Sequence, residues 1–291
     1  MVEVDDAYGV RTWSSGEAGG LPPVLLLHGG PGLWDYLEPV AHMVESLTVA
    51  HRFDQRGCGG SDPSSMHTIT RYVADIEALR RHWGHESWVV VGHSFGAELA
   101  FGYAVAHPDR TAALGYVGGV GVGAWREQYR QERRRRMTDE QWARLQLLDG
   151  HVSRSRPEEV EFRTLSWFTD FADPNAGWGW ALADAEVDLP INFEANRLLV
   201  AETDTWSDST VLAEASRLRM PCWFIHGGSD PRPSGPVASL AAAVPHARFD
   251  IVPDAGHQPW RERPEVIADL LRRLLTVSGS AAAQVSAAGS A

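Results

Sequence analysis

The strongest constraint on the fold of this chain is the alternation of short apolar runs with helix-like stretches. Runs such as VLLLH (24–28) and SWVVVG (87–92) are apolar along their whole length, rather than at every second residue. Strands of this kind are buried on both faces, which is typical of parallel sheets covered by helices. The alternation predicts an α/β fold with a mostly parallel, doubly wound sheet. The predicted strands are residues 24–28, 48–54, 87–92, 112–119, 222–227 and 247–252, and the predicted helices include residues 68–83, 95–107 and 264–275.

The alternation is interrupted in the middle of the chain by a long interval that is rich in Arg, Glu and Trp and is typical of several helices. We therefore predict a helical cap over residues 121–216, inserted into a core that is formed by residues 1–120 and 217–276. Residues 277–291 are small and of low complexity, with little apolar surface to bury. We expect them to form a disordered tail.

Charge and composition exclude several classes of function. The net charge of −12 argues against a nucleic-acid partner, because phosphate binding requires a basic face. The one strongly basic run, RQERRRR (130–136), is interpreted as a solvent-exposed helix face. The chain contains no lysine, which excludes Schiff-base chemistry and a phosphate-loop lysine.

The cellular setting is predicted from what the sequence lacks. No segment approaches the ~20 continuous apolar residues of a membrane span, and the N-terminus lacks the apolar core of an export signal. Two cysteines do not form a disulfide framework in a chain of this size. We expect a cytoplasmic protein with no membrane partner, and the oligomeric state stays open.

The segment GHSFG (92–96) places Ser94 between two glycines, directly after an apolar run and before a helix-like run. This is the context that the G-x-S-x-G motif requires. The strand-to-helix turn is sharp and strains the backbone of the serine, and side chains at Gly92 and Gly96 would collide with neighbouring backbone. The helix N-terminus beyond the turn favours developing negative charge. The motif indicates that Ser94 is a nucleophile.

A serine hydroxyl needs a base and an orienting acid before it attacks a carbonyl. The strongest base among twelve histidines is His257 in PDAGHQPW, which follows a predicted strand. Asp230 in IHGGSDPRP follows the preceding predicted strand, at the same edge of the sheet. The order Ser, Asp, His is that of α/β-hydrolases. We therefore predict a triad of Ser94, Asp230 and His257.

The oxyanion of an acyl-transfer reaction needs backbone N–H donors. The predicted donors are Phe95, next to the nucleophile, and Gly30 in HGGPG (28–32), which follows the first apolar run. No HExxH or paired-cysteine pattern occurs, so we expect neither a metal nor a cofactor. Two related classes of enzyme, haloalkane dehalogenases and epoxide hydrolases, need an aspartate at the position of the nucleophile. The serine at position 94 therefore argues against both.

Taken together, HGGPG, DQRGCGGSDP (54–63), GHSFG, GGSD and AGH resemble the α/β-hydrolase superfamily, and HGGPG with DQRGxGxS resembles its proline iminopeptidase-like serine peptidases. The resemblance implies an α/β-hydrolase fold with a helical cap, a metal-free Ser-His-Asp triad, and release of an N-terminal residue, often proline, from short peptides. It also implies that Asp54 and Arg56 are structural, fixing a loop beside the site. This chain departs from the family in the turn that carries the serine, the nucleophile elbow. The family commonly has GGSWG there, whereas this chain has GHSFG, which is shared with many esterases.

The cap is predicted to select the substrate. An aminopeptidase must hold the free ammonium of its substrate, which a partly desolvated carboxylate does well. INFEANRLL (191–199) resembles the acidic cap helix of the family, which implies this role for Glu194, ahead of Glu186 and Glu202. Trp34 and Trp180 are predicted to line the substrate pocket, although the cap aromatics also fit a small core of their own.

Three functions remain open on these residues. The first is an aminopeptidase for short peptides, the second a carboxylesterase, lactonase or other acyl hydrolase of small molecules, and the third a binding protein on a hydrolase scaffold. A complete triad and oxyanion elements argue against the third.

Overall fold

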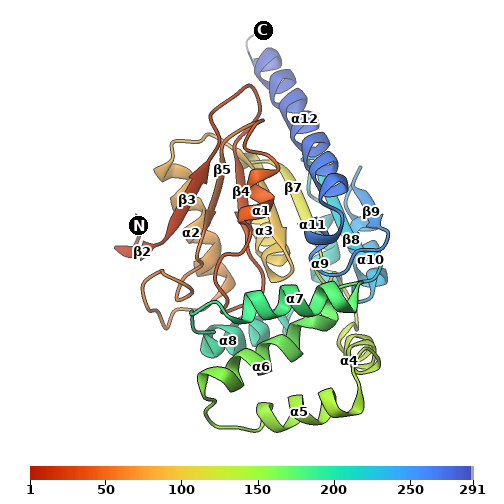
Figure 1. Ribbon diagram of the computed structural model, residues 1–291. Coiled ribbons are helices and arrows are strands. Elements are labelled where there is room, and N and C mark those ends of the chain that lie inside the picture. Colours follow the sequence, from red (N-terminus) through yellow and green to blue (C-terminus); the bar gives the residue numbers. More distant parts are fainter. Residues whose placement is uncertain (290–291) are drawn as a thin grey trace.

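The structure is a computed structural model of the chain that describes residues 1–289, with side chains up to residue 279. Its centre is a seven-stranded sheet in the order β3-β5-β4-β6-β7-β8-β9, in which only β3 is antiparallel to its neighbour (Figure 1). The parallel sheet predicted from the sequence is confirmed. The strands are β3 Thr12–Ser15, β4 Val24–Leu27, β5 Ala50–Phe53, β6 Trp88–His93, β7 Thr111–Val117, β8 Cys222–Gly227 and β9 Arg248–Val252, and a separate hairpin pairs β1 Val2–Val4 with β2 Tyr8–Val10.

Helices cover both faces of the sheet, because successive strand residues point to opposite sides. Along β4, for example, Leu25 and Leu27 pack into one layer and Val24 and Leu26 into the other. The first layer contains α2 Ile69–His82, α3 Phe95–Ala106 and α10 Ser234–Ala243, and the second contains α1 Glu38–His42, α11 Pro259–Glu262 and α12 Pro264–Gly289. A single 3-10 turn, η1 Pro108–Arg110, precedes β7.

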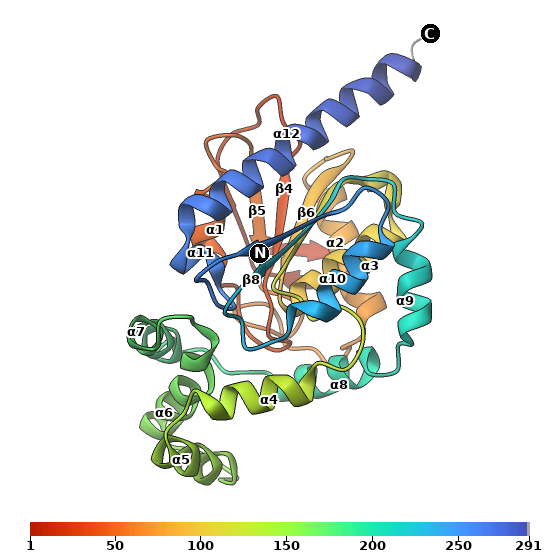
Figure 2. The same ribbon diagram turned by 90° about the vertical axis from the view of Figure 1, so that its right-hand side faces the viewer.

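Six helices lie between β7 and β8, and five of them, α4 to α8, gather at one end of the sheet (Figures 1 and 2). We call these five the cap helices. They are α4 Arg126–Arg135, α5 Asp139–Asp149, α6 Arg156–Trp167, α7 Pro174–Ala185 and α8 Phe193–Thr203, with a short turn, η2 Phe168–Asp170, after α6. Their small core is centred on Leu148, Phe168 and Phe171. The sixth helix, α9 Asp208–Ala215, packs beside α10 (Figure 2).

The C-terminal end differs from the sequence-based expectation. Helix α12 continues to Gly289 and extends beyond the body of the molecule, where a disordered tail was predicted from residue 277 (Figure 1). Alanine is the strongest helix former, so an alanine-rich end can prolong a helix that has already begun. Residues 290–291 of the predicted tail lie outside the described residues. No helix in the described part is long and apolar enough to span a bilayer.

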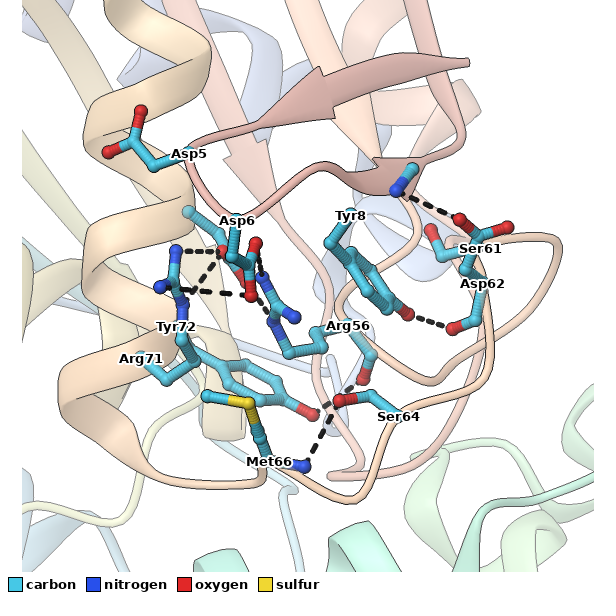
Figure 3. A network of polar contacts seen from close by, with 12 residues as sticks. Asp5, Asp6, Tyr8, Arg56, Ser61, Asp62, Ser64, Met66, Arg71 and Tyr72 are labelled. Carbon is cyan, nitrogen blue, oxygen red and sulfur yellow. Dashed lines mark hydrogen bonds and ion pairs between the residues drawn. The ribbon is translucent and has the colours of Figure 1, made fainter.

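Arg56, in the segment after β5, lies at the centre of a buried ion-pair network (Figure 3). Its guanidinium donates to both carboxylate oxygens of Asp75 on α2, at 2.8 and 2.7 Å, and to Asp6 at 2.9 Å, and it lies over the ring of Tyr8. Burial alone would lower the pKa of this guanidinium, but the two carboxylates raise it. The hydroxyl of Tyr72 donates to the carbonyl of Arg56 at 2.7 Å. These contacts fix the segment to α2 and to the N-terminal hairpin.

We expect Arg56→Met to lower the free energy of unfolding by about 3 kcal/mol or more, because it leaves Asp75 buried without its main partner. Urea unfolding measures the change. The control is Arg81→Gln, which removes an ion pair with Asp5 whose side chains are both half exposed, and which should cost less than about 1 kcal/mol. Equal small losses from both variants would contradict this role for Arg56.

Candidate active site

Ser94 lies in the turn between β6 and α3, at the carboxyl edge of the sheet. Its φ of 56° and ψ of −125° are unusual for a residue with a side chain, and such strain costs about 1–3 kcal/mol. The turn is held by the Ser94 N–H, which donates to the carbonyl of Val117 at 2.8 Å. A Cβ at Gly92 would lie 1.9 Å from the carbonyl oxygen of Gly96, and a Cβ at Gly96 would lie 2.1 Å from that of Leu27. Both glycines are therefore required by close backbone contacts.

His257 and Asp230 form a buried hydrogen-bonded pair on the loops that follow β9 and β8. The Nδ1–H of His257 donates to Oδ2 of Asp230 at 2.6 Å. The other carboxylate oxygen, Oδ1, accepts the backbone N–H of Arg232 at 2.8 Å. Burial alone would raise the pKa of Asp230, but the charges of His257 and Arg232 hold it below its ordinary value. An ionised Asp230 thus fixes the tautomer of His257 that leaves Nε2 free to accept a proton.

The cap helices help to hold this pair. The backbone N–H of His257 donates to the carbonyl of Asp170, in the η2 turn, at 2.7 Å. Arg232 forms ion pairs with Asp170 at 3.0 Å and with Asp230 at 3.3 Å. From the end of α4, Arg136 donates to the carbonyl of Ser229 at 2.8 Å. The loops of Asp230 and His257 are therefore attached to the cap as well as to the sheet.

A chain of hydrogen bonds behind the site was not predicted from the sequence. The N–H of Gly29 donates to the hydroxyl of Tyr36 at 2.8 Å, this hydroxyl donates to Nδ1 of His93 at 2.6 Å, and His93 donates through Nε2–H to the carbonyl of His257 at 2.8 Å. Burial lowers the pKa of His93 well below its ordinary value, which keeps the ring neutral and suited to this pattern. The edge of Trp260 packs against His93, with ring centroids 4.6 Å apart. These hydrogen bonds connect the HGGPG loop, the turn at Ser94 and the loop of His257.

The HGGPG loop is also fixed from the cap side, by the segment INFEAN (191–196). Asn196 donates to the carbonyl of Pro31 at 2.9 Å, and the backbone N–H of Asn192 donates to the carbonyl of Gly32 at 2.9 Å. Gly30, a residue of this loop, lines a cavity together with Ser94. Phe95 is the first residue of α3. Because α3 begins at Phe95, the N–H of this residue has no carbonyl partner within the helix. Gly30 lines both cavities together with Ser94, and Phe95 directly follows Ser94, so both stay the predicted oxyanion donors.

Two cavities meet at Ser94, and both are lined by Ser94, Gly30 and Arg232. The first cavity has a volume of about 420 Å³ and the second a volume of about 230 Å³. The lining side chains include Phe95, Glu98, Phe101, Tyr116, Asp204 and Asp208 in the first cavity, and Trp34, Arg133, Trp167, Asp184, His257 and Gln258 in the second. Within the described part of the chain, no group of three or more His, Cys, Asp and Glu side chains could hold a metal ion.

The structure brings some of the predicted substrate-binding residues to the cavities and leaves others outside. Trp34 lines the second cavity and packs edge-on against Trp167, with ring centroids 6.4 Å apart. Trp180 packs against Phe171 in the core of the cap and does not line either cavity. Glu194 is exposed at the start of α8, outside both cavities.

The weaker acidic candidates also lie elsewhere. Glu202 accepts the N–H of Ile69 at the start of α2, at 2.9 Å, and Glu186 is exposed at the end of α7. In the segment INFEAN, the two asparagines contact the HGGPG loop, whereas the glutamate does not line either cavity.

One of the carboxylates that line the first cavity, Glu98, was not singled out from the sequence. It lies on α3, four residues after Ser94. Residues four apart share a face of a helix, so Glu98 lies on the side of Ser94. Among the residues whose side chains are described, none forms a hydrogen bond or an ion pair with it. Burial raises the pKa of Glu98 to about 7, and Arg126 only partly offsets this effect. A signal was present in the sequence, since a glutamate interrupts the apolar helix that follows the elbow.

We expect Tyr36→Phe to slow the reaction of Ser94 with a fluorophosphonate about 10- to 100-fold, because small displacements of reacting groups are costly. The variant keeps the ring but leaves Gly29 N–H and His93 Nδ1 without their partner. Intact-mass spectrometry over time measures the labelling rate. The control is Tyr103→Phe, which removes a partly buried hydrogen bond to Glu77 away from the site. The prediction fails if the control slows labelling as much, or if Tyr36→Phe labels at the rate of the wild type.

The sequence of the chain matches a known protein family over most of its length. Residues 22–260 match the family described as "alpha/beta hydrolase fold". The chain is 34% identical over 290 residues to a proline iminopeptidase of Xylella fastidiosa, an alignment that covers 89% of this chain and 90% of the relative.

Solved structures show the same fold at lower identity. A crystal structure of a proline iminopeptidase from Mycobacterium smegmatis is 20% identical, with a TM-score of 0.72 and coverage of 96% of this chain and 98% of the other. A thermophilic esterase from Thermogutta terrifontis is 22% identical, with a TM-score of 0.71 and coverage of 94% of each chain. These two likenesses concern the fold alone. From the family match and the relative of near-equal length, the chain belongs to the alpha/beta hydrolase fold family and is a serine hydrolase similar to the proline iminopeptidases.

Proposed function

We propose that this protein is a serine aminopeptidase that releases the N-terminal residue, proline among others, from short peptides. Ser94 Oγ attacks the carbonyl carbon of the first residue and passes its proton to Nε2 of His257. The N–H groups of Gly30 and Phe95 stabilise the oxyanion of the tetrahedral intermediate.

The intermediate then breaks down through the same base. His257 donates its proton to the leaving amine as the C–N bond breaks, which leaves the first residue esterified to Ser94. Water attacks this ester, gives a proton to His257 and releases the amino acid, and the proton returns to Ser94. Asp230 stays ionised throughout and stabilises the imidazolium, which fits its lowered pKa.

The peptidase assignment rests on the unpaired carboxylate of Glu98 in the first cavity. A carboxylate without a partner, close to the nucleophile and beside the apolar side chains of Phe101 and Tyr116, is costly to ionise. A substrate ammonium in the first cavity would provide the missing opposite charge, and charged hydrogen bonds in such a setting are stronger than in water. Of the other carboxylates that line this cavity, Asp204 is paired with Arg126 and Asp208 accepts the backbone N–H of Gly123 at 3.0 Å, whereas Glu98 is available to the substrate.

An ester or lactone hydrolase is the alternative that the GHSFG elbow leaves open. A neutral acyl group in the first cavity would bury Glu98 further without a partner, which is unfavourable. The names of the relatives, one of which is 34% identical over most of its length, also favour the peptidase.

The first test compares wild type and Ser94→Ala on prolyl- and alanyl-anilides, on their N-acetylated forms, and on short p-nitrophenyl esters. We expect wild type to cleave the free-amine anilides and to leave the acetylated forms nearly untouched, because acetylation removes the positive charge. Ser94→Ala should lose nearly all activity, which excludes a contaminant. Equal cleavage of free and acetylated anilides, or turnover of esters only, would reject the aminopeptidase.

The second test is Glu98→Gln, which keeps the size of the side chain and removes its charge. We expect kcat/KM for alanyl-anilide to fall about 10- to 100-fold at pH 8, while hydrolysis of a neutral p-nitrophenyl ester changes little. A loss from Glu194→Gln and none from Glu98→Gln would instead support the cap glutamate.

The same Glu98→Gln variant has a pH-dependent effect on stability. The carboxyl has a pKa of about 7 in the folded protein and an ordinary value of 4.5, so the folded state holds an extra proton between these pH values. Wild-type stability therefore falls as the pH rises from 4.5 to 7, by at most about 3 kcal/mol. We expect Tm of the variant to exceed that of wild type at pH 8 and to approach it at pH 5, as scanning calorimetry would measure.

A further inference from the structure

The second cavity carries one positive charge that no carboxylate neutralises. This charge belongs to Arg133 on α4, whose Nε is buried without a hydrogen-bond partner. No other side chain up to residue 279 forms an ion pair with it. Its neighbours in the same arginine run are all engaged, since Arg135 pairs with Glu132 at 2.7 Å and Arg136 donates to the carbonyl of Ser229. The run is therefore not the uniformly solvent-exposed helix face that the sequence indicates.

The other charges that line this cavity are compensated. Arg232 is held between Asp170 and Asp230, and Asp184 is paired with Arg261 at 2.7 Å. A guanidinium with a buried, unpaired N–H is unfavourable until an anion reaches it. Its planar fork suits a carboxylate in particular, because two N–H groups can bind both oxygens.

The position of His257 shows which part of a substrate enters the second cavity. This base must give its proton to the leaving amine, so the leaving group lies next to His257. His257 lines the second cavity and does not line the first. The acyl part, with its free ammonium, then occupies the first cavity beside Glu98. Ser94 and Gly30, which line both cavities, lie at the scissile bond between them.

From this division we infer that the preferred substrates are zwitterionic short peptides, dipeptides above all, whose C-terminal carboxylate binds Arg133. This inference rests on the proposed aminopeptidase function and extends it to the leaving-group side. In a dipeptide the carboxylate lies one residue beyond the scissile bond, about 3.8 Å further along the chain.

The size and walls of the second cavity favour a short leaving group. Its volume is about 230 Å³, roughly half that of the first cavity, and its walls include the large rings of Trp34 and Trp167. Gln258, the neighbour of His257, has a buried Oε1 without a hydrogen-bond partner. This oxygen can accept an N–H of the leaving amine once His257 has protonated it.

The test compares prolyl-alanine with prolyl-alaninamide, which differ only in the terminal carboxylate. We expect wild type to favour the dipeptide by about 10-fold or more in kcat/KM, as one charged hydrogen-bonded contact provides. Arg133→Gln should remove most of this preference by lowering kcat/KM for the dipeptide, while activity on the amide and on prolyl-anilide stays within a factor of about three. The matched control is Arg135→Gln, which changes an exposed arginine of the same helix and should leave the preference intact.

The outcomes separate the two proposals. If wild type cleaves prolyl-anilide and both peptides but does not distinguish dipeptide from amide, the role of Arg133 is rejected and the aminopeptidase stands. The same holds if Arg133→Gln lowers both activities equally. If neither the anilide nor the peptides are cleaved, the aminopeptidase itself is rejected. The wild-type comparison needs no variant, so it can reject the preference for a terminal carboxylate even if Arg133→Gln does not fold.

Discussion

The strained backbone at Ser94 is the constraint on which the rest of the site depends. A side chain at a φ of 56° persists only where its surroundings hold it. Here β6, β4 and α3 approach so closely that Gly92 and Gly96 have no room for a Cβ. This contact directs the serine out of the sheet and starts a helix immediately after it. The parallel sheet then brings the loops of Asp230 and His257 to the same edge, because the carboxyl ends of parallel strands lie together.

Charge is divided around this serine in a way that matches a peptide bond between two charged ends. On one side the partly buried Glu98 has no partner and desolvation raises its pKa, and on the other the Nε–H of Arg133 is buried without a partner. Both groups would be poor choices for stability alone, since unpaired buried polar groups are unfavourable. Functional sites are where such local conflicts are expected. Both cavities reach Ser94; Glu98 and Phe101 of α3 line the first, whereas His257 lines the second.

The sequence predicted the parts of this structure that depend on local patterns. Uniformly apolar runs such as 24–28 and 222–227 are strands within a residue of their predicted ends, because burial on both faces leaves a continuous apolar signal. The role proposed for Arg133 could not be predicted, since its neighbours in the arginine run have the same chemistry and only tertiary contacts distinguish them. Tyr36 acts through partners that are 7 and 57 residues away in the chain. Glu194 was chosen by resemblance, and the orientation of α8 turns it to the surface.

The hydrogen bond from the backbone of His257 to the carbonyl of Asp170 has a consequence for how the enzyme admits solvent and substrate. The cap helices cannot swing away from the sheet while this bond and the Arg232–Asp170 pair persist. Displacement of the cap would therefore also loosen the loop that carries His257. Any movement of the cap is thereby coupled to the position of His257, the base in the proposed reaction.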